Sequence, residues 1–280
     1  MSIPSLTYLS LGAGVQSGTL VEMIVDGQLP LIDVVIFADT GDEPDYVYKH
    51  VDYLRSRLSG VGIPLETVTK GDIVKDAQGK GRFAAIPVFT VIDGKKGKLR
   101  RQCTREYKIE PIEKLIRQQL LGLGKAREYS NGAIHVNKDV EVVCWLGLSL
   151  DEVQRMKPSR MKWIKNQWPL IDLRMTRHDC KLWLRERNLF VPSKSACRIC
   201  PFHNDRHFRD MRDNHPLDWE HVVAFDHFLR SGNSRFTASA KGALYLHHQC
   251  VPLDDVDLST PQDHGQLEMF DECDDGYCFV

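Results

Sequence analysis

The sequence has no run of apolar residues long enough to span a membrane, although 42% of its 280 residues are hydrophobic. Its first residues also lack the charged-then-apolar order of a secretory signal peptide. Together these two absences predict a cytoplasmic protein that does not act in a membrane. At this length the chain can bury a full hydrophobic core.

Lysine and arginine are absent after Lys241, and nine acidic residues follow it. The net charge of −1 therefore combines an acidic C-terminal stretch with a basic body. A basic body suits a polyanionic partner, and the acidic stretch could cover the same surface. An ordinary solvated surface with a solvated tail is the alternative.

The eight cysteines are not expected to form disulfides. A reducing cytosol favours metal or redox roles for thiols over a disulfide framework.

The first half of the chain alternates strand and helix patterns. Uninterrupted apolar strands are predicted at 6–11, 31–41, 63–70 and 140–148, and helices at 17–26 and 44–58. This order predicts an α/β, Rossmann-like domain whose parallel sheet is covered on both faces.

A mainly helical C-terminal part is expected to follow. Its predicted helices are 176–188, with Thr176 as N-cap, and 215–232, ending at Gly232. The predicted organisation is a nucleotide-binding domain at 1–155, a Cys-rich helical part at 156–253 and an acidic tail at 254–280.

A glycine-rich turn, Gly12-x-Gly14-x-x-Ser17, follows the first strand. It is not the dinucleotide fingerprint, because Ser17 replaces the third glycine, and no Gly-Lys-Ser/Thr makes it a Walker A loop. Its amides and the Ser17 hydroxyl, at a helix N-terminus, suit phosphate or pyrophosphate. A plain strand-to-helix connection is the alternative.

Four stretches together resemble the adenine nucleotide alpha-hydrolase superfamily, the PP-loop ATP pyrophosphatases. Within it they are most similar to the phosphoadenosine phosphosulfate reductase-like branch, which includes the sulfur-transfer enzymes of DNA phosphorothioation. The stretches are GAGVQS (12–17), FADTGDE (37–43), GLSLDEVQR (147–155) and WPLIDLRMTRHDCKLWL (168–184). The chain departs from the family pattern at Gln16, where aspartate is usual, and at Ser149, where arginine is usual.

The resemblance implies a PP-loop fold that binds ATP and Mg²⁺. The implied nucleotide-binding residues are Ser10, Gly12, Gly14, Gln16, Ser17, Asp39, Thr40, Gly41 and Gly147. The implied catalytic residues are Ser17, Asp39, Glu152 and Arg155. The implied reaction is attack on the α-phosphate, which gives an adenylated intermediate and pyrophosphate, followed by displacement of AMP by a sulfur nucleophile. For Asp39, a cap on the following turn is the alternative.

Cys197-x-x-Cys200 places two thiols in a tight turn, and two thiols alone do not complete a metal site. Cys103 and Cys180 are the candidates for the rest, and four thiolates suit either zinc or an iron–sulfur cluster. The stretch CTREYKIEPI (103–112) resembles a cysteine-bearing stretch of the phosphorothioation enzymes. That resemblance implies a [4Fe–4S] cluster on Cys103, Cys197 and Cys200, with Cys180 as the fourth ligand and His203 as its competitor.

Structural Zn²⁺ and a dithiol without metal are the alternatives for these cysteines. Cys144, inside an apolar strand, is expected to pack in the core. Cys273 and Cys278 form a second pair in the acidic stretch, where a reactive role and a plain C-terminal end are both open. For His247 and His248, the sequence is equally consistent with a structural role and with a functional role.

Basic residues gather near Cys103 and again after Arg155. Arg101, Arg105, Lys108 and Lys162 are predicted to hold substrate phosphates, and Trp163 and Trp168 offer surfaces for base stacking. A solvated basic face with core tryptophans is the alternative.

The sequence thus predicts an ATP-dependent sulfur transferase that acts on a nucleic acid or nucleotide, with a cysteine desulfurase or another sulfur donor as partner. The first alternative is a phosphoadenosine phosphosulfate reductase-type oxidoreductase. The second is a zinc-stabilised nucleic-acid-binding protein on a degenerate PP-loop fold.

Overall fold

The computed structural model describes residues 4–79, 86–259 and 263. The chain divides into two compact units that are interleaved in sequence. The first unit comprises Met1–Asp39, Asp45–Lys70 and Lys108–Ser195, and the second comprises Thr40–Pro44, Gly71–Tyr107 and Ala196–Val280.

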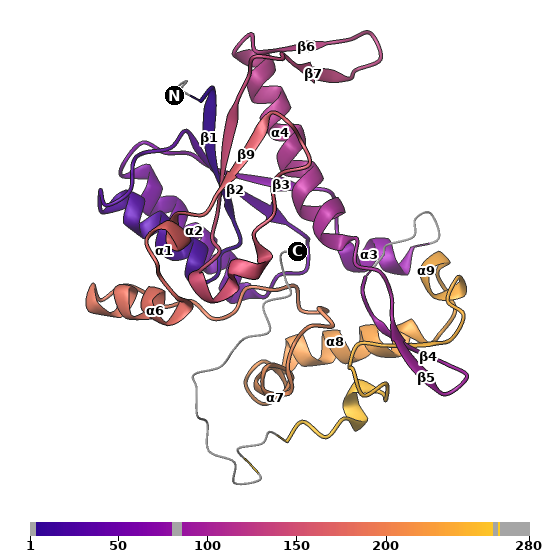
Figure 1. Ribbon diagram of the computed structural model, residues 1–280. Helices are drawn as coiled ribbons and strands as arrows, with labels where there is room; N and C mark the ends of the chain where they lie inside the picture. The colour runs from indigo at the N-terminus through magenta and orange to yellow at the C-terminus, as the bar shows by residue number, and fades with distance from the viewer. Residues whose placement is uncertain (1–3, 80–85, 260–262, 264–280) are drawn as a thin grey trace. The chain divides into compact units, whose positions relative to one another are not determined.

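A five-stranded parallel sheet forms the centre of the first unit (Figure 1). Its strand order is β3-β2-β1-β8-β9. The strands are β1 (Leu6–Leu11), β2 (Val34–Asp39), β3 (Leu65–Thr69), β8 (Val142–Leu146) and β9 (Ile164–Gln167). The predicted α/β class and parallel sheet are confirmed.

Helices cover both faces of this sheet. The helices of the first unit are α1 (Val15–Val25), α2 (Asp45–Ser59), α4 (Glu110–Gly122), α5 (Pro169–Asp172) and α6 (Arg177–Glu186), with a 3₁₀ helix, η2 (Leu150–Arg155). Leu9 and Phe37 pack with α1, α2 and α6, whereas Tyr8 and Ile36 pack with α4 on the opposite face. The inner strands β2 and β8 are therefore almost entirely apolar because both of their faces are buried, whereas the edge strands β3 and β9 carry polar residues.

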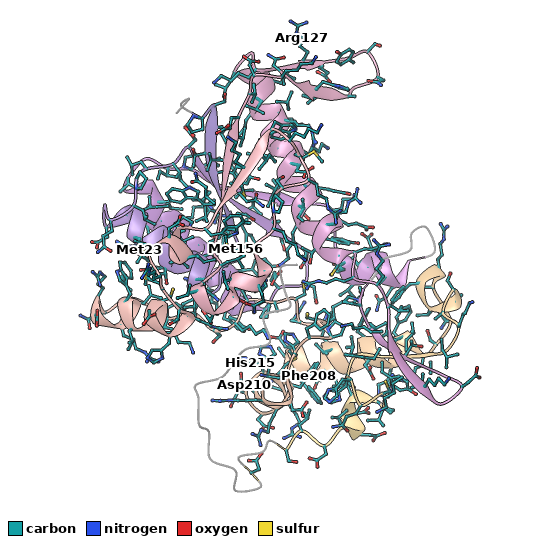
Figure 2. The ribbon with its side chains drawn as sticks, viewed as in Figure 1. Met23, Arg127, Met156, Phe208, Asp210 and His215 are labelled. Carbon is teal, nitrogen blue, oxygen red and sulfur yellow. The ribbon has the colours of Figure 1, made fainter. Side chains whose placement is uncertain are left out.

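Smaller elements complete the first unit. A two-stranded hairpin, β6 (Ala126–Glu128) and β7 (Ile134–Val136), follows α4, and Figure 2 labels Arg127 on it. A π-helical turn, η1 (Thr104–Ile109), directly precedes α4; its residues up to Tyr107 belong to the second unit and those from Lys108 belong to the first.

Several local predictions hold in detail. The first strand spans the predicted residues, and Thr176 caps α6 in a reciprocal capping box with Asp179. Cys144 is a core residue, and burial raises the pKa of its thiol to about 12.

The division of the chain differs from a single boundary after residue 155. Strand β9 pairs with β8 at the edge of the sheet, and α6 buries Cys180 and Leu184 in the same core as α1. Residues 156–195 therefore belong with the sheet. Residues 71–107 belong with the second unit.

The second unit is mainly helical, as predicted for the C-terminal part. Its elements are α3 (Ile73–Gln78), α7 (Asp205–Asn214), α8 (Pro216–Leu229), α9 (Arg235–Ala238), η3 (Leu253–Asp255) and the strands β4 (Phe89–Ile92), β5 (Lys95–Lys98) and β10 (Ala243–Tyr245). The strands form an antiparallel sheet, in the order β10-β4-β5, that the sequence did not predict. The core of the second unit contains the fully buried phenylalanine residues Phe208, Phe225 and Phe236. Figure 2 labels Phe208.

No helix in the described part of the chain is both long and apolar enough to cross a membrane. Cys273 and Cys278, and most of the predicted acidic tail, lie outside the described residues.

Candidate functional site

Strands β1 and β8 meet at the point where the strand order of the sheet reverses. The chain continues from β1 to β2 on one side, and β8 and β9 lie on the other. Ligands of open parallel sheets bind outside the carboxyl ends of the strands at such a switch point. The turn at 12–14, after β1, and the turn at 147–149, after β8, therefore flank the expected position of a ligand.

Helix α1 begins beside this point with no side-chain cap. Gly14 is its N-cap residue, and the first helical hydrogen bond runs from the N–H of Gly18 to the carbonyl of Gly14, at 2.9 Å. The amides of the first turn thus have no helical acceptor, and there is no acidic residue in that turn. A bound anion would satisfy these amides.

The His50 side chain forms a hydrogen bond to the main chain of this loop. Ala13 has a left-handed backbone, with φ of 57°, and its carbonyl accepts a hydrogen bond from His50 Nδ1 at 3.0 Å. His50 is buried, and burial lowers its pKa more than the carbonyl raises it. The side chain is therefore a neutral donor that fixes the shape of the loop.

Gly147 lies directly against the first turn of α1. A Cβ atom at this position would sit 2.8 Å from the Ser17 nitrogen and 2.9 Å from its Cα. Only glycine allows this approach, so the two turns form one continuous surface. Ser17 is buried, and its Oγ is 3.5 Å from the Gly14 carbonyl.

Gln16 connects α1 to η2. Its Nε2 donates to Ser149 Oγ at 3.3 Å and to Glu152 Oε2 at 3.2 Å, and Glu152 also forms an ion pair with Arg155. Burial raises the pKa of Glu152, against the lowering effect of Arg155. Gln16 and Ser149, the two departures noted in the sequence, therefore contact each other, and Gln16 also contacts the Glu152 carboxylate.

Arg155 has unused hydrogen-bonding capacity. Its side chain is only 10% exposed, and Nη1 pairs with Glu152. Nε and Nη2 are buried and, within the described part of the chain, have no partner. Two buried guanidinium donors without an acceptor favour a bound anion, because leaving them unsatisfied costs about 1–3 kcal/mol or more.

Ser195 is a site residue that sequence reasoning missed. Its Cβ would be 3.7 Å from a Cβ at Gly14, and its Oγ is buried without a partner among the described residues. No spacing or period marks this serine, which lies 178 positions after Ser17 in the chain. The fold alone brings it to the loop.

The other implied nucleotide residues divide between the units. Asp39 ends β2 in the first unit, and its Oδ1 accepts a hydrogen bond from the Tyr48 hydroxyl at 2.9 Å. Ser10 lies within β1. Thr40 and Gly41 belong to the second unit, where a Cβ at Gly41 would meet Asp72 at 2.9 Å.

The second unit contains the cysteine loop, residues 196–203. It makes two successive turns, from the Cys197 carbonyl to the Cys200 N–H at 3.0 Å and from the Cys200 carbonyl to the His203 N–H at 3.3 Å. Both thiols are half-buried. Thr40 Oγ1 lies 3.0 Å from Cys197 Sγ, so an implied nucleotide-binding residue contacts a predicted metal ligand.

Cys103 and Cys180 occupy different surroundings. Cys103 is half-buried, directly precedes η1 and packs against the core of the second unit. Cys180 is fully buried in the core of the first unit, and burial raises the pKa of its thiol to about 12. His203 is buried, with Nε2 at 3.0 Å from the Cys197 carbonyl.

Basic side chains lie beside the cysteine loop within the second unit. Lys98 Nζ and the Arg101 guanidinium carbon lie 4.7 and 5.4 Å from the centre of the Phe202 ring. Arg101 Nε is buried without a partner among the described residues, whereas Arg105 is exposed. The lysines of β5 are exposed on an edge strand, where charge also discourages pairing with another chain.

The remaining predicted substrate residues belong to the first unit. Lys162 is exposed and Lys108 is half-buried. Trp163 packs against the core with Arg117 over its ring at 5.4 Å, and Trp168 is also partly buried. The tryptophans are therefore partly core residues.

No protein-family model and no curated protein matches the chain. Among solved structures, the crystal structure of phosphoadenylyl-sulfate (PAPS) reductase from Candida auris, in a phosphate complex, is similar at 15% sequence identity and a TM-score of 0.39. The match covers 68% of this chain and 76% of that chain. A likeness at this level does not establish a family or an activity.

Proposed function

We propose that the first unit binds the phosphates of ATP at the loop after β1, and that the chain is an ATP-dependent sulfur transferase. The observation that carries the proposal is Arg155, a buried guanidinium with two donors that have no acceptor among the described residues. The uncapped N-terminus of α1 and the buried Ser195 hydroxyl support the same anion site.

Each side chain has a distinct role in this proposal. The amides after Gly14 and the Ser17 hydroxyl bind the phosphates, and Arg155 donates from Nε and Nη2 to them. Glu152 orients Arg155 through their ion pair, and Gln16 orients Glu152.

Asp39 is the carboxylate that we propose for Mg²⁺. Glu152 is already bound by Arg155 and Gln16. Asp39 is the last residue of β2, which pairs in parallel with β1, so it lies at the same end of the sheet as the loop after β1. Carboxylates together with substrate phosphates are the usual ligands of Mg²⁺. The acceptor oxygen would attack the α-phosphorus, and pyrophosphate would leave with the electron pair of the broken P–O bond.

We propose that Cys103, Cys197 and Cys200 of the second unit supply the thiolates of an iron–sulfur cluster. Cys103, Cys197 and Cys200 are all half-buried, so each is partly exposed to solvent. Thr40 Oγ1 lies 3.0 Å from Cys197 Sγ, and Lys98 and Arg101 lie over the ring of Phe202 in the same loop. A cluster on these three thiolates would supply sulfide or electrons. The prediction that Cys180 is a fourth ligand remains, but the proposal does not depend on it.

The acceptor that we propose is a nucleic acid or a nucleotide. Arg101, Arg105 and the exposed lysines of β5 would neutralise its phosphates, and Lys108 and Lys162 stay predicted contacts. Binding through these groups would weaken steeply as salt rises.

The decisive experiment measures pyrophosphate release from ATP by protein purified without oxygen, with candidate acceptors and a sulfide source. Arg155→Lys keeps a charge for Glu152 but removes the fork of donors, and we expect it to reduce pyrophosphate release at least about tenfold. Arg127→Gln, on the exposed β6–β7 hairpin, is the matched control and should leave the rate unchanged.

Other outcomes identify the alternatives. Sulfite formation from phosphoadenosine phosphosulfate with a thiol donor, and no pyrophosphate from ATP, would make the protein a reductase. Salt-sensitive nucleic-acid binding without turnover would make it a binding protein.

The metal is tested separately on the same preparation. We expect iron and acid-labile sulfide in about equal amounts, lost in Cys197→Ala. One zinc ion without sulfide that is lost in Cys197→Ala would instead make the cysteine site structural.

A further inference from the structure

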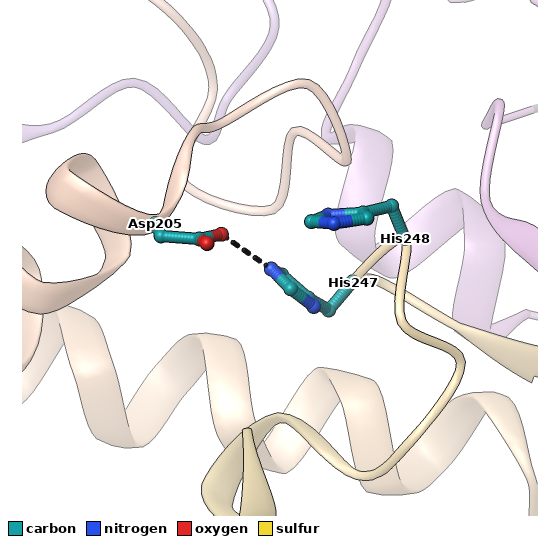
Figure 3. A group of neighbouring side chains, drawn as sticks. All are labelled: Asp205, His247 and His248. Carbon is teal, nitrogen blue, oxygen red and sulfur yellow. Dashed lines mark hydrogen bonds and ion pairs between the residues drawn. The ribbon is translucent and has the colours of Figure 1, made fainter. Parts of the chain in front are cut away.

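Asp205, His247 and His248 form a cluster apart from the loop and the cysteines (Figure 3). Asp205 is the first residue of α7, and the two histidines follow β10. Within residues 4–79, 86–259 and 263, this is the one group of three or more His, Cys, Asp or Glu side chains whose ligand atoms all lie within 4.8 Å of one another. We propose that these three side chains hold a divalent transition-metal ion.

The spacing of the donors suits one ion. His247 Nε2 lies 2.8 Å from Asp205 Oδ1. Bonds from zinc to imidazole nitrogen and carboxylate oxygen are about 2.0–2.2 Å long, so two neighbouring ligands of one ion lie about 3 Å apart. The rings of His247 and His248 are 4.2 Å apart between centroids, and both reach from one loop towards Asp205 in Figure 3.

The donor set defines the class of metal. Imidazole suits zinc, iron, nickel and copper, and two histidines with one carboxylate are found at zinc and non-haem iron sites. No thiol belongs to this cluster. The ion would therefore be held independently of the cysteine loop.

Without a metal, the hydrogen bonds define the state of His247. Nε2 carries the proton and donates to Asp205, and Nδ1 accepts from the Gln249 N–H at 3.3 Å. The ion would take the place of the Nε2 proton, which moves to Nδ1, so the ring stays neutral. The Gln249 contact is then given up, and at 3.3 Å it is a long and weak one.

The loop that carries both histidines is fixed at its two ends by one buried carboxylate. Asp226 is fully buried and accepts from the N–H groups of Leu246, at 2.8 Å, and Leu253, at 3.0 Å. Arg230 neutralises it at 2.7 Å. The histidines thus need little ordering when a metal binds, which is the property of a preorganised site.

The site is open on one side. His247 is fully buried, Asp205 is half-buried and His248 is exposed. An ion can reach the cluster from the solvent side past His248. Three protein ligands leave at least one position for water, as in zinc sites that are not closed.

Titration with Co²⁺ tests the proposal on the full chain after dialysis against a mild chelator. We expect one equivalent to bind with a visible spectrum that lacks the charge-transfer band of thiolate ligands, and to bind equally in Cys197→Ser. His248→Ala, which changes an exposed residue, and Asp205→Asn should each weaken binding by about tenfold or more. His227→Ala is the matched control, because His227 bonds to Asp254 at 3.0 Å in the same way but without a second histidine.

Two results would overturn the site. One is the absence of Co²⁺ binding outside the thiolates, whether Co²⁺ binds only with the thiolate band or does not bind. The other is an affinity of His248→Ala within about twofold of the unchanged protein. Neither result bears on pyrophosphate release, so this proposal and the proposed function fail separately.

Discussion

Asp42 Oδ2 accepts a hydrogen bond from the main-chain N–H of Ile199 at 3.1 Å, in the middle of the Cys197-x-x-Cys200 turn. The same buried carboxylate accepts from Arg198 and, at 2.8 Å, from His221 on α8. Asp42 and Asp218 raise the pKa of Arg198, although burial alone would lower it. The segment after β2 therefore fixes the cysteine turn.

Asp42→Asn should destabilise the second unit by about 3–5 kcal/mol, because the partly buried guanidinium of Arg198 then loses one of its two carboxylate partners. It should also speed alkylation of Cys197 and Cys200. Denaturant unfolding and thiol-labelling rates measure both effects. Asp218→Asn removes the more exposed partner of the same Arg198 and should cost only about 1 kcal/mol. Equal effects of the two changes would contradict the role of Asp42.

Gln16→Glu should destabilise the first unit by about 1–3 kcal/mol. The change replaces an amide donor, 3.2 Å from Glu152, by a second carboxylate. Gln28→Glu is the control, because Gln28 donates to Asp26 at 2.9 Å in an exposed position, and it should stay within about 0.5 kcal/mol. Urea denaturation compares them, and similar losses would show that the contact with Glu152 contributes nothing.

Gly147→Ala should disturb the loop without removing any side chain. Its Cβ would lie 2.8 Å from the Ser17 nitrogen, so the first turn of α1 must shift, at a cost of about 1–3 kcal/mol. We expect ATP affinity, measured by calorimetry, to fall at least about tenfold. Gly122→Ala, which meets nothing within 4 Å, is the control. Unchanged affinity in Gly147→Ala would remove the phosphate site from this loop.

His50→Asn should reduce the dependence of stability on pH. Burial holds the pKa of His50 below its ordinary 6.5. Between that lowered pKa and 6.5 the unfolded chain binds a proton that the folded chain does not, so this part of the stability is full above pH 6.5 and is lost as pH falls.

Asn can still donate to the Ala13 carbonyl but does not titrate. The slope of unfolding free energy between pH 7 and 5 should therefore fall by up to about 1.4 kcal/mol per pH unit. The exposed His135→Asn should leave the slope as it is. A slope unchanged in His50→Asn would show that this histidine does not titrate differently on folding.

The sequence alone determined the parallel sheet and the loop after its first strand. Strands such as Val142–Leu146 are continuous apolar runs because both faces of the sheet are covered, and this pattern is local. The cap at Thr176 and the core position of Cys144 are equally local, because each depends on neighbours in the chain or on the apolarity of one strand.

Tertiary structure alone decided which distant residues meet. Ser195 lies against Gly14, Gln16 bonds to Glu152, and Asp42 bonds to Ile199, across separations that no periodicity encodes. Strand β9 pairs with β8 and so keeps the chain after residue 155 in the first unit. The sequence did not predict this pairing, because residues 155–165 are rich in basic residues and do not form an apolar strand pattern. Local propensity determines elements, whereas long-range packing and the pairing of buried charges determine a site.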